Sequence, residues 1–238
     1  MTSQVIRSQD FVCEAAEFIV AHGRQALAAR GEFRVALSGG NTPRPVYQEM
    51  ARIAPDLPWE HVFFTFGDER CVPPDNEKSN FRMARESLFI PAAVPERSIA
   101  RMRGEVDPQL AAQEYQNQLD VLATEKGEMT YRHDLILLGL GDDGHTASLF
   151  PGTAALQEKS RGVMANFVPK LNEWRLTLTY PLLEQARAVC FLVNAGKRED
   201  LIAKVRAGDE QYPAARVENA NLTWILGQPA GAGTITSR

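Results

Sequence analysis

Four short, largely apolar runs, each ending in a cluster of glycine and polar residues, constrain the fold of this chain more than any other feature. They lie at residues 33–37, 62–66, 134–138 and 189–193. Runs of this length and composition predict strands that are buried on both faces of a sheet. Before and between these runs, apolar residues recur at helical spacing over residues 8–30, 43–53, 79–88 and 107–126. The alternation predicts an α/β protein with an open, mainly parallel sheet.

Other segments add weaker expectations. Alternation and β-branched residues favour strands at residues 162–168, 175–179 and 222–226, with a short strand near Ile99. A helical turn is expected from Pro181, and a short helix over residues 147–150 before Pro151 and Gly152. Cys190 lies within an apolar run, which places it in the core rather than in a reactive site.

The residues that follow the four runs are unusual: SGGNTP at 38–43, GDER at 67–70, GLGDDGHT at 139–146 and NAGK at 194–197. In an open parallel sheet the carboxyl ends of the strands lie along one edge, where ligands bind. We therefore expect these four loops to converge on one cleft.

The first loop has the features of an anion site. Its glycines allow close approach of the backbone to a ligand, Thr42 suits an N-cap, and Pro43 suits the first helical position. The following helix would direct its N–H groups and positive dipole end at the loop. The candidate ligands of an anion, most plausibly a phosphate, are the backbone N–H groups of Ser38, Gly39, Gly40, Asn41 and Thr42. A plain turn and a serine-hydrolase elbow at Ser38 are the alternatives.

The third loop contains Asp143 two residues before His145. Asp143 could accept a hydrogen bond from the imidazole and fix its tautomer, which would leave His145 as a general base. The loop also matches the dinucleotide fingerprint G-x-G-x-x-G, but Asp142 and Asp143 would repel a pyrophosphate. No Walker A loop occurs, and four dispersed histidines without HExxH disfavour a metal site.

The second and fourth loops carry further charged residues. Asp68 or Glu69 could hold sugar hydroxyls or move a proton, while Arg70 could bind a carboxylate, a phosphate or a developing oxyanion. An ion-paired turn is the alternative for this cluster. Lys197 lies near the N-terminus of a predicted helix, where the dipole disfavours a cation, so that it is either solvated or holds an anion.

Composition limits the class of protein. The chain has 238 residues, 44% of them apolar, and can bury a full core as a single domain over residues 1–238. A net charge of -4 and a pI of about 5.7 disfavour nucleic acid or an anionic membrane as partner. Three scattered cysteines and the lack of a signal peptide or membrane span lead us to expect a cytoplasmic protein.

Several segments together closely resemble the 6-phosphogluconolactonase family, of the superfamily that includes glucosamine-6-phosphate deaminase. They are ALSGGNTP, FGDERCVPPDNEKSN, LILLGLGDDGHTASLFPG, RLTLTYPLL and NAGK. The resemblance implies a Rossmann-like α/β fold with helices on both faces of the sheet. It also implies hydrolysis of 6-phospho-D-glucono-1,5-lactone in the oxidative pentose phosphate pathway, without metal, nucleotide or other cofactor. The deaminases differ in having tyrosine in place of Arg70 and an Ile-Ala-Phe-Asn run in place of residues 146–150.

On this reading, the substrate phosphate is held by the first loop and Lys197, with Arg175 as a further candidate contact. His145 activates water, Asp143 orients His145, and Arg70 or nearby N–H groups stabilise the oxyanion. Asp68 would bind hydroxyls or assist. Three rivals remain open: an amino-sugar phosphate deaminase, a non-catalytic sugar-phosphate sensor and a serine esterase using Ser38. We expect a monomer or weak homodimer whose partner is a small sugar-phosphate lactone.

Overall fold

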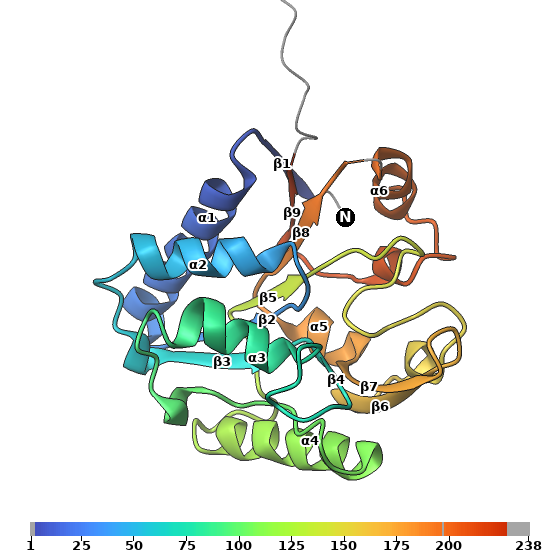
Figure 1. The fold of residues 1–238 in the computed structure, drawn as a ribbon, viewed down its shortest axis with the longest axis horizontal. Helices are drawn as coiled ribbons and strands as arrows, with labels where there is room; N and C mark the ends of the chain where they lie inside the picture. The colour runs from blue at the N-terminus through green and yellow to red at the C-terminus, as the bar shows by residue number, and fades with distance from the viewer. Residues whose placement is uncertain (1–2, 197, 228–238) are drawn as a thin grey trace, which may run out of the picture.

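A six-stranded, wholly parallel sheet forms the centre of the molecule in a computed structural model that describes residues 3–196 and 198–227 (Figure 1). The strand order is β1-β9-β8-β5-β2-β3. The strands are β1 (Gln4–Ser8), β2 (Phe33–Leu37), β3 (Val62–Phe66), β5 (Leu135–Leu138), β8 (Val189–Asn194) and β9 (Leu222–Gly227). The sequence prediction of a mainly parallel sheet in an α/β fold is therefore confirmed.

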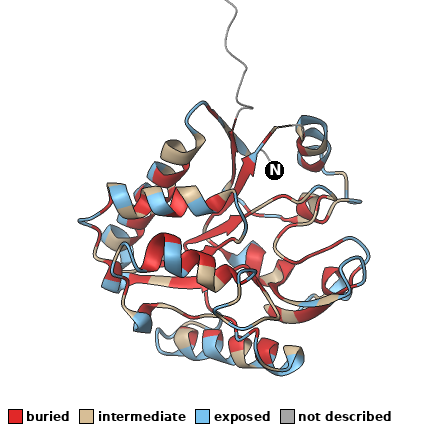
Figure 2. Cartoon of the chain, viewed as in Figure 1, coloured by how far each residue is buried: buried red, intermediate tan, exposed pale blue. Residues whose placement is uncertain are grey.

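Both faces of this sheet are covered by helices. One hydrophobic cluster joins the sheet to α1 (Phe11–Arg30), α2 (Pro43–Ile53), α3 (Asn80–Ala84) and the π-helical turn Arg85–Phe89. The other joins it to α4 (Pro108–Thr124), α5 (Tyr180–Gln185) and α6 (Glu199–Arg206). The strands are buried while the outer helix surfaces are exposed (Figure 2). Burial of each large apolar side chain stabilises the fold by about 1.5–3 kcal/mol.

Side chains alternate between the two clusters along each strand. In β2, Val35 and Leu37 lie in the first cluster and Ala36 in the second. In β8, Cys190 lies in the first cluster and is fully buried, which confirms its place in the core, whereas Phe191 lies in the second, stacked on Trp224. Because helices pack on both faces of the sheet, each strand needs apolar side chains on both of its faces. This explains why these strands appear in the sequence as largely apolar runs.

A second, three-stranded antiparallel sheet lies beside the first, in the order β4 (Asp68–Arg70), β7 (Glu173–Leu178) and β6 (Val163–Val168). Gly67 connects the two sheets, because its N–H donates to the carbonyl of Leu37 and its carbonyl accepts from the N–H of Leu178. The sequence predicted β6 and β7 but not this separate sheet. Asp68 to Arg70, expected in a loop, instead form a short strand.

Two local predictions were wrong. Residues 4–8 form the edge strand β1, and α1 begins only at Phe11, where Asp10 caps it by accepting from the N–H of Cys13. Residues 147–150 form no helix: Ala147 has φ +47° and Thr146 pairs with Leu149 in an isolated antiparallel bridge. Hydrogen bonds of Ser148 to the second sheet hold this segment in its irregular conformation.

The remaining short elements are single 3₁₀ turns at Trp59–His61, Glu96–Ser98, Ala154–Gln157 and Pro213–Arg216. Ile99 forms the expected extended contact, an isolated parallel bridge to Phe64. No helix within residues 3–196 and 198–227 is long and apolar enough to cross a membrane.

The strands β2 and β5 are parallel neighbours in the sheet, and the order in which the chain adds further strands reverses between them. From β2 the chain continues to β3 on one side, and from β5 it continues to β8 and β9 on the other. The loops that leave the carboxyl ends of such a strand pair separate and create a crevice, which is where ligands bind in open α/β sheets. The first and third loops of the sequence leave β2 and β5.

Candidate active site

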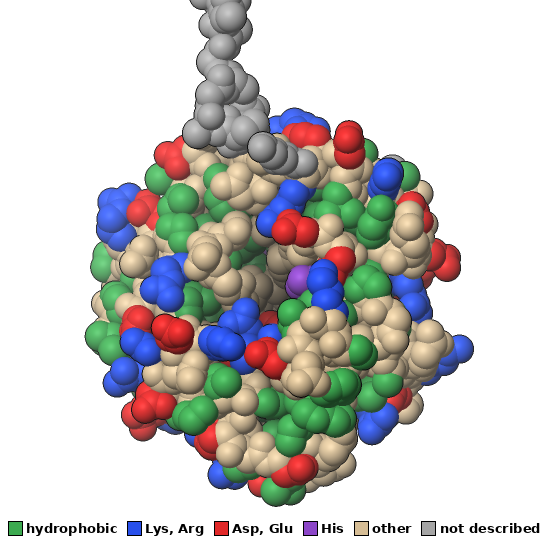
Figure 3. All heavy atoms as spheres, turned by 45° about the vertical axis from the view of Figure 1, so that its right-hand side comes forward, with side chains coloured by type: hydrophobic (Ala, Val, Ile, Leu, Met, Phe, Trp, Pro, Cys, Tyr) green, Lys and Arg blue, Asp and Glu red, His purple; other side chains and the backbone are tan. Residues whose placement is uncertain are grey.

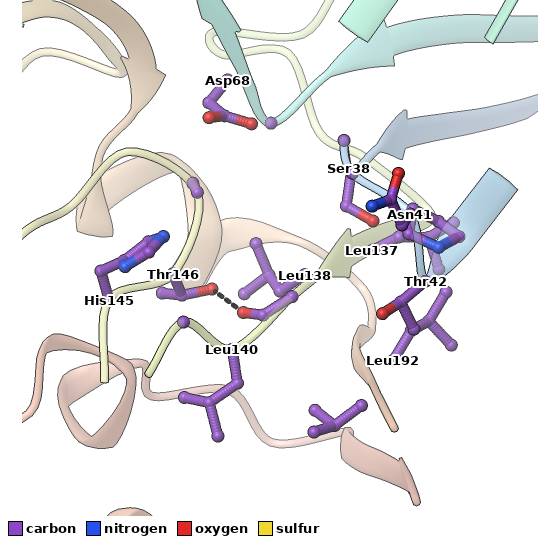
Figure 4. A pocket seen from close by; sticks show the side chains of 18 of the residues that line it. Ser38, Asn41, Thr42, Asp68, Leu137, Leu138, Leu140, His145, Thr146 and Leu192 are labelled. Carbon is purple, nitrogen blue, oxygen red and sulfur yellow. Dashed lines mark hydrogen bonds between the residues drawn. The ribbon is translucent and has the colours of Figure 1, made fainter. Parts of the chain in front are cut away.

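A pocket opens at the carboxyl ends of these strands and is lined by three of the four loops that the sequence singled out. The first, second and third loops contribute residues 38–43, Gly67, Asp68, Arg70, 139–141 and 145–147. Of the fourth loop, residues 194–196 do not line the pocket and Lys197 lies outside the described residues, although Val193 in β8 and Arg198 do line it on either side of that loop. Ser38, Asn41 and Thr42 lie on one side of the pocket and His145 on the other, with Asp68 between them (Figure 4).

The first loop is held by Tyr47, a buried residue of α2. The N–H of Ser38 donates to Tyr47 Oη at 3.0 Å, and Tyr47 Oη donates to the carbonyl of Ser38 at 2.9 Å. In this structure the Ser38 N–H is therefore bonded within the protein and is not among the free donors of the loop, and its expected contact with an anion stays a prediction. Ser38 Oγ is buried in the pocket wall and has no hydrogen-bond partner among the described residues.

The backbone N–H groups of Gly39, Gly40, Asn41 and Thr42 make no hydrogen bond within the described part of the chain. Thr42 occupies the N-cap position of α2 in a helical conformation, and its side chain forms no capping bond, contrary to the sequence prediction. Helical dihedrals at this position carry its hydroxyl away from the geometry that caps a helix. The loop therefore offers free donors at the positive end of α2.

Close packing explains the glycine at position 39. A Cβ on Gly39 would come within 1.9 Å of Asn80 Oδ1, so that the loop and Asn80 could not both keep their places. Gly40 has φ +98°, a conformation that side chains other than that of glycine rarely adopt. Both glycines thus serve the shape of the loop.

His145 is fixed on three sides. Asp143 Oδ1 lies 2.6 Å from His145 Nδ1, as the sequence predicted. The imidazole stacks on Phe150, with ring centroids 3.9 Å apart and planes inclined by 20°. Gly141 borders the ring closely, and Thr146 anchors the loop by donating to the carbonyl of Gly139 at 2.8 Å (Figure 4). With Nδ1–H donating to Asp143, Nε2 carries the lone pair that a base needs.

Asp143 also contacts Lys170, a residue of the turn between β6 and β7. Lys170 Nζ lies 2.9 Å from Asp143 Oδ2. Burial alone would raise the pKa of Asp143, but the hydrogen bonds from Lys170 and His145 outweigh it and lower that pKa to about 2. Asp143 is thus an anion at neutral pH.

Asp68 is aimed by two residues that the sequence did not single out. Ser148 Oγ donates to Asp68 Oδ2 at 2.7 Å, and Asn80 Nδ2 donates to Asp68 Oδ1 at 3.1 Å. All three residues are buried. Neither donor forms a short-range motif with Asp68, since Ser148 lies 80 residues away along the chain, so that only the fold reveals the contact.

The sequence did not distinguish between Asp68 and Glu69 as the functional carboxylate, and in the structure Glu69 has a structural role. Its carboxylate accepts hydrogen bonds from the N–H groups of Arg70, Asn80 and Phe81 and from Ser79 Oγ. Burial raises its pKa, while these backbone donors counteract the rise. Glu69 therefore holds the start of α3, and its oxygens do not face the pocket.

The three arginines near the site are placed differently. Arg70 lines the pocket and donates to the carbonyl of Lys78. Arg175 pairs with Glu173 at 2.5 Å and lines a second hollow, not the pocket itself. Arg198, which sequence reasoning missed, lines the pocket and contacts Asp142 at 2.7 Å and the carbonyl of Leu140 at 2.8 Å. In the sequence, the only indication of a cation at this position was the neighbouring Lys197.

The second hollow, called here the outer hollow, adjoins the pocket. The two share Asp68, Arg70, His145 and Ala147, and the outer hollow also includes Asp143 and Lys170. The space-filling view shows a histidine at the rim of a hollow with basic and acidic side chains around it (Figure 3). No group of three or more His, Cys, Asp or Glu side chains placed to hold a metal ion occurs among residues 3–196 and 198–227.

Comparison with known proteins gives consistent matches over nearly the whole chain. Residues 7–225 match the model of the family described as glucosamine-6-phosphate isomerases/6-phosphogluconolactonase. A 6-phosphogluconolactonase from Synechocystis sp. is 40% identical over 236 residues, which cover 97% of this chain and 95% of the relative.

Solved structures agree in fold. The crystal structure of a 6-phosphogluconolactonase from Thermotoga maritima matches with a TM-score of 0.84 and 27% identity, covering 96% of this chain and 100% of that one. The 6-phosphogluconolactonase from Trypanosoma brucei matches with a TM-score of 0.83 and 28% identity, covering 95% and 96%.

Proposed function

The chain belongs to the family of glucosamine-6-phosphate isomerases and 6-phosphogluconolactonases, and on this premise we propose the function that its site supports best. The protein is a lactonase that hydrolyses 6-phospho-D-glucono-1,5-lactone to 6-phosphogluconate in the oxidative pentose phosphate pathway. The observation that carries the proposal is the Asp143–His145 pair facing a loop of free N–H donors across one pocket. A base and an anion site at opposite ends suit a phosphorylated lactone.

The phosphate occupies the first loop. The N–H groups of Gly39 to Thr42 and the N-terminal end of α2 supply donors and a positive potential. Arg198 borders the same pocket and adds a positive charge. Lys197, predicted from the sequence as a phosphate ligand, lies outside the described residues and stays a prediction. Anchoring the phosphate makes the attack on the distant lactone carbon a local event.

His145 is the general base in this proposal. Its Nε2 takes a proton from water while the water oxygen bonds to the lactone carbonyl carbon, C1. The carbonyl electrons move to oxygen, and the resulting tetrahedral oxyanion collapses. The bond from C1 to the ring oxygen breaks, and His145 returns the proton to that oxygen. The new carboxylic acid loses its own proton to solvent at neutral pH.

Arg70 and Asp68 complete the site. Arg70 lines both the pocket and the outer hollow beside His145, and no carboxylate pairs with it among the described residues. Its charge is available to the oxyanion, for which one good donor is worth about 3–4 kcal/mol. Asp68, held by Ser148 and Asn80, is positioned to accept hydrogen bonds from sugar hydroxyls. Arg175, a candidate phosphate contact from the sequence, faces the outer hollow and is assigned no phosphate contact.

A direct assay tests this function. Freshly generated 6-phosphogluconolactone is supplied to the wild-type protein, with unphosphorylated gluconolactone as the matched control. We expect acceleration over spontaneous hydrolysis with the phosphorylated lactone and far less with the control. Absence of acceleration, together with ammonia release from glucosamine 6-phosphate, would instead establish the deaminase reaction in the same cleft.

The substrate is a small sugar-phosphate lactone. A cytoplasmic location, a monomer or weak homodimer, and a single domain over residues 1–238 stay predictions from the sequence. For the single domain, the support is that both hydrophobic clusters rest on one six-stranded sheet.

A further inference from the structure

The turn that joins β6 to β7 reaches the loop that carries His145. The hairpin is paired over its whole length, from Val163 with Leu178 to Val168 with Glu173, and its other partner strand β4 carries Asp68 and Arg70. Lys170 lies in its turn and projects to Asp143, with the Nζ to Oδ2 distance of 2.9 Å. No pattern in the sequence assigns a role to Lys170.

The two oxygens of Asp143 are divided between two partners. Oδ1 faces His145 Nδ1 at 2.6 Å and Oδ2 faces Lys170 Nζ at 2.9 Å. A rotation of the Asp143 side chain would therefore break both contacts together. A carboxylate held at one oxygen can direct the other, and this is how an orienting group fixes an imidazole.

Other charged groups face Asp143 across the outer hollow but have different partners. They are Asp68, Arg70, Asp142 and Arg175. Arg175 pairs with Glu173, Asp142 pairs with Arg198, and Arg70 donates to the carbonyl of Lys78. Within the described residues, Asp143 directly contacts Lys170 and His145, and Lys170 is the one of the two that is always a cation at neutral pH.

We propose that Lys170 is a positioning residue that fixes the rotamer of Asp143 and thereby the orientation of His145. Its effect on turnover rests on the proposed function, whereas its effect on His145 in the free protein does not. The side chain of Lys170 is 67% exposed and that of Asp143 is 23% exposed, so that the contact is screened by solvent and its effect is modest.

The test compares the wild type with Lys170→Met, Lys170→Arg and a control, Lys159→Met, which alters an exposed lysine outside the pocket and the outer hollow. In the free protein, the Nδ1–H proton of His145, which faces Asp143 Oδ1, is followed by NMR. In Lys170→Met we expect its signal to broaden and to exchange faster with solvent, because Asp143 is no longer held in one rotamer. Lys170→Arg and Lys159→Met should keep the wild-type signal.

Kinetics give the second readout. For Lys170→Met we expect kcat about threefold to fivefold lower, with KM within about twofold, and the acid limb of kcat/KM displaced to higher pH. In about 1 M salt the acid limb of the wild type should itself move to higher pH, since screening weakens the same contact. This shift is measured on the wild type alone and therefore holds even if a substitution disturbs folding.

An Nδ1–H signal of His145 and a kcat that are identical in the wild type and Lys170→Met would overturn the inference. Failure of the proposed function looks different: the wild type itself would not accelerate lactone hydrolysis, and the NMR signal of His145 would still decide the role of Lys170.

Discussion

Gly141 lies so close to the imidazole of His145 that a Cβ at this position would come within 2.0 Å of His145 Cε1. The ring is stacked on Phe150 and bonded to Asp143, so that it has little room to yield. The glycine in the middle of the third loop is therefore a condition for the placement of the His145 ring.

We expect Gly141→Ala to displace the imidazole and to lower kcat by about 100-fold, because misplacement of a catalytic group by about 1 Å has effects of this size. The matched control for the position of the ring is Gly139→Ala, since a Cβ at Gly139, which also lines the pocket, meets no protein atom within 4 Å. A crystal structure of each variant, with kcat measured alongside, checks the prediction. An undisplaced ring with normal turnover in Gly141→Ala would show that His145 is not held as described.

The ionised state of Asp143 predicts a pH dependence of stability. The pKa of Asp143 in the folded protein is lowered to about 2, below its ordinary value of 3.8. A carboxyl group whose pKa is lowered by folding stabilises the folded protein at pH values above its pKa in the unfolded chain. This stabilisation is lost as pH falls from about 4 to about 2. The difference in free energy of unfolding between wild type and Asp143→Asn should therefore shrink over this range. Urea unfolding at several pH values measures it, and a constant difference would contradict the account.

Tyr47 gives a prediction about substrate binding. Tyr47→Phe removes the hydroxyl that bonds both the N–H and the carbonyl of Ser38, so that the first loop loses its support. We expect KM for the phosphorylated lactone to rise with little change in kcat, and the free energy of unfolding to fall by about 1–3 kcal/mol, because a buried N–H loses its partner.

Tyr115→Phe is the matched control for this substitution. Tyr115 is also buried, and its hydroxyl likewise accepts from a backbone N–H, that of Phe66, and donates to the carbonyl of Ala100. It does not line the pocket. Similar loss of stability with an unchanged KM is expected there, whereas an equal rise of KM in both variants would assign the effect of Tyr47 to general destabilisation.

Arg198 is expected to act on the phosphate. Arg198→Gln should raise KM for 6-phosphogluconolactone by about tenfold, on the basis of about 1.5 kcal/mol for one charged hydrogen bond. Hydrolysis of unphosphorylated gluconolactone should not change. Steady-state kinetics with both lactones distinguish the outcomes: equal losses on both substrates would place Arg198 in support of the third loop, through Asp142 and Leu140, instead of on the phosphate.

Much of the fold could be predicted because its strongest determinants are local. The strands β2, β3, β5 and β8 are buried on both faces, and this condition leaves continuous apolar runs in the sequence. The convergence of their loops then follows from a general property of parallel sheets. The bond between Asp143 and His145 was predictable because the two residues are close in the chain.

The errors concern contacts between separate elements of the fold. The edge strand β1 has the exposed polar residues Gln4 and Arg7 on either side of the half-buried Val5 and Ile6, so that it lacks a continuous apolar pattern. The helix expected over residues 147–150 is replaced by an irregular turn held by Thr177 and Asp68. The N–H of Ser38 is taken by Tyr47, and Ser148 and Asn80 support Asp68, which no local pattern indicates.

The central claim is that His145, oriented by Asp143, activates water for attack on a phosphorylated lactone. The most direct measurement is the hydrolysis of freshly generated 6-phosphogluconolactone by the wild type and by His145→Ala, after thermal unfolding has shown that both are folded. We expect kcat to fall by about 10²- to 10⁴-fold in the variant, the range typical of general-base catalysis. A folded His145→Ala protein that turns over the lactone at the wild-type rate would contradict it.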